Sequence, residues 1–211
     1  MHFKRLLYYK AIENKHHAFY DPNETLSSIF PAENIKIEID LGEKGKLILD
    51  KSNGLDTVIG SKNSNPLVAC FYSIYISKNQ YNDFVSDIKK INYDLQPNTK
   101  LSALGSHVLI ITNLNEFIRR FKESVLKNHL HGVSSFIRYV DPKKDYGFIP
   151  DRLIGFTKTT NFQYEREYRF AIGSSTLQAE SYDLEIGNIE DISAVIRFDQ
   201  FCKTKFSIQQ P

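Results

Sequence analysis

The chain has 211 residues, and its 27 Lys and Arg against 25 Asp and Glu give a formal charge of +2. This near balance excludes a strongly basic nucleic-acid-binding protein and an acidic tail protein. With 41% apolar and 25% charged residues, the composition is typical of a globular protein, and the length favours one domain over residues 1–211. Trp is absent, so Tyr, with 12 residues, supplies the rings that can both stack on a flat ligand and donate a hydrogen bond.

Neither the N-terminus nor the cysteines indicate a secreted or membrane protein. Residues 1–10 lack the apolar stretch of a secretory signal, and no apolar run approaches the roughly 18 residues needed to cross a bilayer. Cys70 and Cys202 are too few for a disulfide framework and lie in no metal-ligand spacing. We therefore expect a soluble, cytoplasmic protein with reduced thiols.

The N-terminal half predicts strands separated by turns. Over residues 35–41, Ile and Leu alternate with charged residues, which indicates a strand with one buried face, and a turn at 42–45 leads to a second arm at 46–50. Residues 52–66 are rich in turn formers and predict a surface loop. The apolar run at 67–76 predicts a central strand covered on both faces. Apolar residues at helical spacing then predict a helix over 81–91.

The second half predicts a strand at 107–111, followed by a helix. Asn113 and Asn115 are candidate N-caps of this helix, and residues 129–132 should end it. Its expected core stripe consists of Phe117, Ile118, Phe121, Val125 and Leu126. Further strands are predicted at 133–140, 182–186 and 192–198. Because strands and helices do not alternate regularly, we expect an α+β fold with a mixed or antiparallel sheet.

The segment Gln-Tyr-Glu-Arg-Glu-Tyr-Arg-Phe at 163–170 is the strongest candidate for a functional site. If it is a strand, Glu165, Glu167 and Arg169 share one face, and Tyr164, Arg166, Tyr168 and Phe170 share the other. Neighbouring carboxylates raise one another's pKa and a nearby Arg lowers it, so this group could provide one acid and one electrostatic stabiliser. The alternative is a solvent-facing strand whose charges pair across the sheet. The apolar residues 170–172 favour a position beside the core.

A Glu-x-Glu at a strand start, followed by an aromatic and apolar residues, resembles the third motif of the ADP-ribosyltransferase superfamily, in which the second Glu is catalytic. Residues 7–10 (LYYK) lie where the first motif has Arg or His, with Tyr9 at that point, and residues 70–75 (CFYSIY) lie where the second motif has Ser or Tyr. The segment 107–117 is similar to the mid-domain strand and turn of DarT-like toxins. The chain also resembles uncharacterised bacterial proteins with a CFS-type segment and a later YE-x-E-aromatic-R segment.

The resemblance implies a split-sheet fold that binds NAD as a substrate and needs no metal. Nicotinamide would lie against Tyr72 or Tyr75, and Glu167 would bind the 2′-hydroxyl of the adjacent ribose. Glu165 would orient or deprotonate the acceptor, and Arg169 would either fix Glu167 or contact phosphate. The remaining cofactor-binding residues would be Tyr8, Tyr9, Lys10 and Ser73.

The resemblance further implies a macromolecular acceptor, which could be RNA, DNA or protein, and the role of an intracellular bacterial toxin or phage-defence effector with an antitoxin partner. Two alternatives remain open. One is a metal-independent nuclease in which Glu165 or Glu167 is the general base, Arg169 holds the scissile phosphate and a His is the acid. Aromatic side chains stack on bases as readily as on nicotinamide, so the Tyr content suits this alternative equally well. The other is a non-catalytic interaction module with an ion-paired strand.

Overall fold

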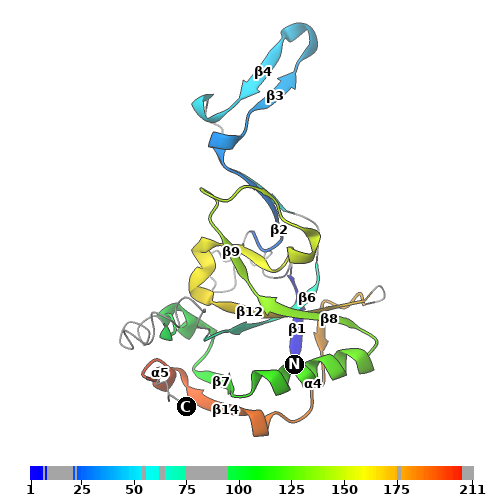
Figure 1. Ribbon diagram of the computed structural model, residues 1–211, viewed down its shortest axis with the longest axis vertical. Coiled ribbons are helices and arrows are strands. Elements are labelled where there is room, and N and C mark those ends of the chain that lie inside the picture. Colours follow the sequence, from blue (N-terminus) through cyan, green and yellow to red (C-terminus); the bar gives the residue numbers. More distant parts are fainter. Residues whose placement is uncertain are drawn as a thin grey trace.

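The computed structural model describes residues 1–6, 8, 21, 23–53, 56–61, 65–74, 95–174 and 177–205. These residues form a mixed α+β fold of mostly antiparallel strands with few helices, in agreement with the expected fold class (Figure 1). The helix predicted over 81–91 lies outside the described residues. Within the described ranges, no helix is long and apolar enough to span a bilayer.

A five-stranded antiparallel sheet forms the centre of the molecule, in the order β13-β1-β6-β12-β8. Its strands are β1 (His2–Arg5), β6 (Leu67–Tyr72), β8 (His131–Phe136), β12 (Glu167–Gly173) and β13 (Ser181–Asp183). The central strand predicted at 67–76 is confirmed as β6, which pairs with β1 on one side and with β12 on the other. This arrangement makes β6 and β12 direct neighbours, and the candidate site lies where they meet.

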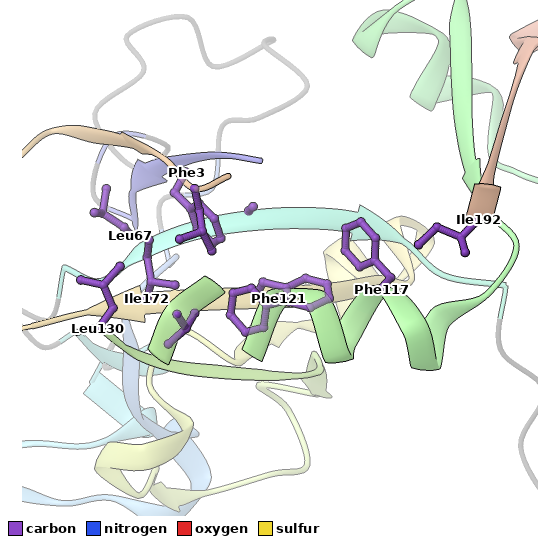
Figure 2. Packing of buried hydrophobic residues seen from close by; sticks show 11 residues of the cluster. Phe3, Leu67, Phe117, Phe121, Leu130, Ile172 and Ile192 are labelled. Carbon is purple, nitrogen blue, oxygen red and sulfur yellow. The ribbon is translucent and has the colours of Figure 1, made fainter. Parts of the chain in front are cut away.

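Helix α4 (Leu114–Lys127) covers one face of this sheet (Figures 1 and 2). Asn113 caps it, because its side-chain oxygen accepts a hydrogen bond from the Glu116 amide at 3.0 Å. The rings of Phe117 and Phe121 meet Phe170 of β12 edge-on, with centroids 5.6 and 4.9 Å apart. The helix is therefore held by aromatic packing on the apolar face of β12.

One residue of the predicted core stripe of α4 is exposed. Phe117, Phe121 and Val125, spaced four residues apart, are buried, whereas Leu126 is 73% exposed. Leu126 follows Val125 by one position, so a helical rotation of about 100° turns it away from the sheet. The polar residue Ser124 is buried instead, and its hydroxyl donates a hydrogen bond to the Glu185 carbonyl oxygen at 2.5 Å.

The remaining strands form smaller sheets. They are a three-stranded sheet of β10 (Gly147–Phe148), β2 (Leu26–Phe30) and β5 (Val58–Ser61), a parallel pair of β9 (Arg138–Val140) and β11 (Thr157–Thr159), and an antiparallel pair of β7 (His107–Ile111) and β14 (Ser193–Arg197). β5 lies inside the predicted loop 52–66, and the strand predicted at 133–140 is divided into β8 and β9 at Ile137. The short helices are η1 (Ala32–Asn34), η2 (Gly42–Lys44), η3 (Lys51–Asn53), η4 (Thr99–Leu104), η5 (Asp151–Leu153), η6 (Thr160–Glu165), η7 (Glu190–Ile192) and α5 (Phe198–Phe201).

The hairpin of β3 (Ile37–Asp40) and β4 (Lys46–Leu49) projects away from the central sheet (Figure 1). The two strands and the turn between them were predicted correctly. The prediction of a buried face is wrong, because Ile37, Ile39 and Leu47 are 37–43% exposed. Alternation indicates which side chains share a face, but burial of that face requires a second layer, and none covers the hairpin among the described residues.

Candidate active site

The backbone changes direction at Arg166, immediately before β12. Residues 160–165 form η6 and Arg166 has left-handed angles, φ 43° and ψ 49°, so the strand begins only at Glu167. The condition considered above, that residues 163–170 form one strand, is therefore not met before Glu167. Two backbone bonds hold the bend: the Arg166 amide donates to the Gln163 carbonyl at 3.2 Å, and the Ser73 amide donates to the Arg166 carbonyl at 2.8 Å. A left-handed backbone costs about 1–2 kcal/mol in a residue other than glycine.

Glu167 and Arg169 share the face of β12 that points away from α4, as their spacing predicts. Arg169 is 1% exposed, and each of its three guanidinium nitrogens has a protein partner. Nε contacts Glu167 Oε1 at 2.6 Å, Nη2 contacts Glu24 Oε1 at 2.5 Å, and Nη1 donates to the Gly155 carbonyl oxygen. Of the two roles considered for Arg169, this geometry favours fixing Glu167 over contacting a phosphate.

Lys158 of β11 is the second buried cation beside Glu167. Its ammonium nitrogen lies 3.0 Å from Glu167 Oε2 and 2.7 Å from Glu165 Oε2. It lies 3.5 Å from Glu24 Oε2 and 3.9 Å from Asp21 Oδ2. Glu165 precedes the strand, yet its carboxylate reaches the same cation as Glu167. We call these six residues the buried charge cluster: Asp21, Glu24, Lys158, Glu165, Glu167 and Arg169.

The two glutamates predicted as a functional pair have opposite pKa shifts. Burial would raise the pKa of Glu167, but the charges of Arg169 and Lys158 outweigh it and lower the pKa to about 2. For Glu165 burial dominates, and its pKa is raised despite the charge of Lys158. Glu167 is therefore a fixed anion, whereas Glu165 is the more easily protonated partner.

Glu167 also lines an open cleft of about 910 Å³, a volume typical of small-ligand sites. Its described lining residues are Tyr72, Ser73, Gln96, Pro97, Asn98, Thr99, Phe136, Ile137, Tyr139, Gln163, Tyr164, Arg166 and Glu167. The amide of Glu167 donates to the Tyr139 hydroxyl at 2.9 Å, which places a second polar group beside the carboxylate. The cleft thus combines four aromatic rings with one buried anion.

The structure brings only part of the predicted site together. Tyr72 is directly opposite Glu167 in the sheet, and Ser73 follows it into the cleft. Tyr8 lies elsewhere, because β1 places Arg5 opposite Leu67, at the far end of β6 from Tyr72. The Tyr8 ring is 48% exposed and lies under the Lys4 ammonium, 4.1 Å from the ring centroid.

Three predicted site residues, Tyr9, Lys10 and Tyr75, lie outside the described residues. Arg5, the cation near the first predicted motif, does not reach Glu167. Its guanidinium donates to the backbone carbonyl oxygens of Ala179, Asn65 and Leu177. Arg5 therefore holds neighbouring segments of the fold together at the far end of the sheet.

Sequence reasoning missed three members of the buried charge cluster, Asp21, Glu24 and Lys158. They come from segments remote from β12, and no local spacing links them to Glu167. One signal in the sequence was available. The charged residues at 165–169 stand beside an apolar strand, and charged side chains at such a position need buried partners of opposite charge. Sequence reasoning also missed Arg166 as a residue of the site, because strict strand alternation assigns it to the face opposite Glu167.

No protein-family model, curated protein or solved structure matches the chain. In the part of the chain that the structure describes, no group of three or more His, Cys, Asp or Glu side chains is arranged to hold a metal ion.

Proposed function

We propose that the protein is an NAD-dependent ADP-ribosyltransferase with Glu167 as its catalytic carboxylate. One observation carries the proposal: Glu167, whose ionised carboxylate is held by two buried cations, is also a lining residue of an aromatic cleft. A preorganised anion of this kind stabilises positive charge as it develops in a transition state. The nearby rings of Tyr72, Tyr139 and Tyr164 offer surfaces on which a flat heterocycle can stack.

In the proposed reaction, the bond between nicotinamide and ribose C1′ breaks, and its electron pair goes to the nicotinamide nitrogen. Glu167 accepts a hydrogen bond from the ribose 2′-hydroxyl and stabilises the oxocarbenium-like carbon. A nucleophile of the acceptor then bonds to C1′ and loses its proton. Glu165 has a raised pKa and shares Lys158 with Glu167, which suits the receipt of that proton, but it is not among the described lining residues, so the acceptor would have to reach past the cleft wall to contact it.

The sheet order supports the same proposal. Two of the segments that resemble superfamily motifs include β6 and β12, which are neighbours in one antiparallel sheet, and β1, which precedes the first of these segments in the chain, pairs with the other side of β6. An ADP-ribosyltransferase-like split sheet is part of the proposal, as is an acceptor that is RNA, DNA or protein. A role as a toxin or phage-defence effector with an antitoxin partner follows from the sequence resemblance.

The direct test is to incubate the purified protein with NAD labelled on the adenine moiety, in the presence of RNA, DNA or cell extract. We expect release of free nicotinamide and transfer of the label to one acceptor class. Absence of both, at protein concentrations comparable to the NAD concentration, would refute the proposal.

One observation favours the non-catalytic alternative. Each carboxylate of the buried charge cluster lies within 3.9 Å of a buried cation, as expected of an ion-paired structural core. Under that alternative, the cluster stabilises the fold and the protein leaves NAD intact. The nuclease alternative has weaker support, because the buried guanidinium of Arg169 is already bonded to protein groups.

A further inference from the structure

We propose that Arg166 binds the phosphate groups of the ligand in the cleft. The identity of that ligand as NAD rests on the proposed function, whereas the assignment of a phosphate site rests on Arg166 and its surroundings. Arg5 does not belong to this site, because its guanidinium is bonded to backbone groups at the other end of the sheet.

The left-handed backbone is what directs Arg166 into the cleft. Successive residues of a strand point to opposite faces, so a regular strand would separate Arg166 from Glu167. The bend at φ 43° breaks this alternation, and both side chains line the same cleft. The site therefore has a cation and an anion side by side on consecutive residues.

The backbone of this position does not require an arginine. Its amide and carbonyl are both bonded, to Gln163 and Ser73, and both bonds are made by the backbone. Glycine would adopt the same angles without strain. Strained residues other than glycine concentrate at ligand sites, which indicates that the side chain itself is what this position contributes.

Arg166 is a positively charged group in the described lining of the cleft. It is the single Lys or Arg among the described lining residues, and its side chain is half-buried. Lys158 and Arg169 are buried within the charge cluster. The Tyr72 hydroxyl lies nearby: burial raises its pKa, and the charge of Arg166 opposes this increase.

That Tyr72 hydroxyl oxygen is buried and has no hydrogen-bond partner among the described residues. A ligand oxygen placed between the Tyr72 hydroxyl and the Arg166 guanidinium would accept a hydrogen bond from each of them. A guanidinium and a hydroxyl are suitable phosphate donors. With Glu167 next to them, the cleft fits a ligand that is anionic at one end and develops positive charge at the other, as NAD does.

The test uses the full chain and ADP, which carries the phosphates but no nicotinamide, with adenosine as the probe that lacks phosphate. Calorimetric titration should show that Arg166→Gly weakens ADP binding at least tenfold and leaves any adenosine binding unchanged. Because glycine relieves the strained backbone, this variant should melt at the same temperature as the wild type or higher. Arg152→Gln, which changes an exposed arginine outside the cleft, should bind ADP like the wild type.

Two results would overturn the inference: wild-type protein that does not bind ADP at millimolar concentration, or Arg166→Gly protein that binds it equally well. Glu167→Gln separates this inference from the proposed function, since that variant should retain ADP binding while losing NAD consumption. Arg166-dependent ADP binding in a protein that leaves NAD intact would support the phosphate site and refute the transferase. NAD consumption with an unchanged KM in Arg166→Gly would refute the phosphate site alone.

Discussion

Glu24 and Glu167 contact the same two buried cations, yet their pKa values move in opposite directions. Glu167 lies 2.6 Å from Arg169 and 3.0 Å from Lys158, and its pKa is lowered to about 2. Glu24 lies 2.5 Å from Arg169 but 3.5 Å from Lys158, and burial raises its pKa to about 7, assisted by the charge of Glu167. Two cations cannot fully compensate all the neighbouring carboxylates, so Glu24 takes up a proton most readily and Glu167 stays ionised.

This relationship predicts how stability changes with pH. Between pH 4.5 and pH 7 the folded protein holds a proton on Glu24 that the unfolded chain has released, so the free energy of unfolding should fall as pH rises through this window. The decrease should be on the order of 2 kcal/mol and should end above about pH 8. Below pH 4.5, Glu167 has the opposite effect, and stability should fall as the pH drops toward 2. Urea denaturation between pH 3 and pH 9 measures both changes.

Glu24→Gln provides the control for the pH prediction. The amide has nearly the same shape but cannot titrate, so the stability of this variant should vary less between pH 4.5 and pH 7 than that of the wild type. A pH dependence identical to that of the wild type would show that Glu24 does not carry the proton.

Removing the shared guanidinium should destabilise the protein strongly. Arg169→Met leaves Glu167 and Glu24 buried without their closest cation, and we expect a loss of about 3–5 kcal/mol in the free energy of unfolding. The matched substitution Arg119→Met breaks contacts with Glu116 and Glu123 on the exposed side of α4. That loss should be much smaller, because solvent screens these exposed contacts. Equal losses in the two variants would contradict a buried, compensating role for Arg169.

The packing of α4 gives a second pair of matched variants. Phe121 is 1% exposed and packs on Phe170, so Phe121→Ala should cost about 3–5 kcal/mol. Leu126 is 73% exposed on the same helix, and Leu126→Ala should change stability by less than about 0.5 kcal/mol. Chemical denaturation of the two variants tests which residues of the helix face the sheet; a large loss in Leu126→Ala would contradict the helix orientation.

Local sequence patterns correctly predicted those helices and strands whose structure depends on residues nearby in the sequence. The alternation at 35–41, the apolar runs of β6 and β7, and the cap of α4 at Asn113 all have local causes. The pairing of Glu167 with Arg169 was also predictable, since residues two apart on a strand share a face.

The remaining features depend on contacts between distant segments. Lys158 reaches Glu167, and Glu24 reaches Lys158 and Arg169, only because β11 and the turn before β2 fold against β12. The left-handed bend at Arg166 is fixed by Ser73, which is more than 90 residues away in the chain. The residue pattern within 160–170 does not indicate these contacts. The first residue of β12 and the position of Arg166 could therefore not be predicted from the sequence.

The central claim is that Glu167 stabilises the departure of nicotinamide, and Glu167→Gln tests it most directly. The charge of Glu167 is one cause of the raised pKa of Glu24, so we expect Glu24 to ionise more readily in this variant and to compensate Arg169 and Lys158; a melting curve checks that the variant is folded. Asp21→Asn is the matched control, because Asp21 is a buried carboxylate of the same cluster that does not line the cleft. We predict that Glu167→Gln lowers nicotinamide release from NAD at least 100-fold, whereas Asp21→Asn retains it. Nicotinamide release by folded Glu167→Gln protein at the wild-type rate would contradict the assignment.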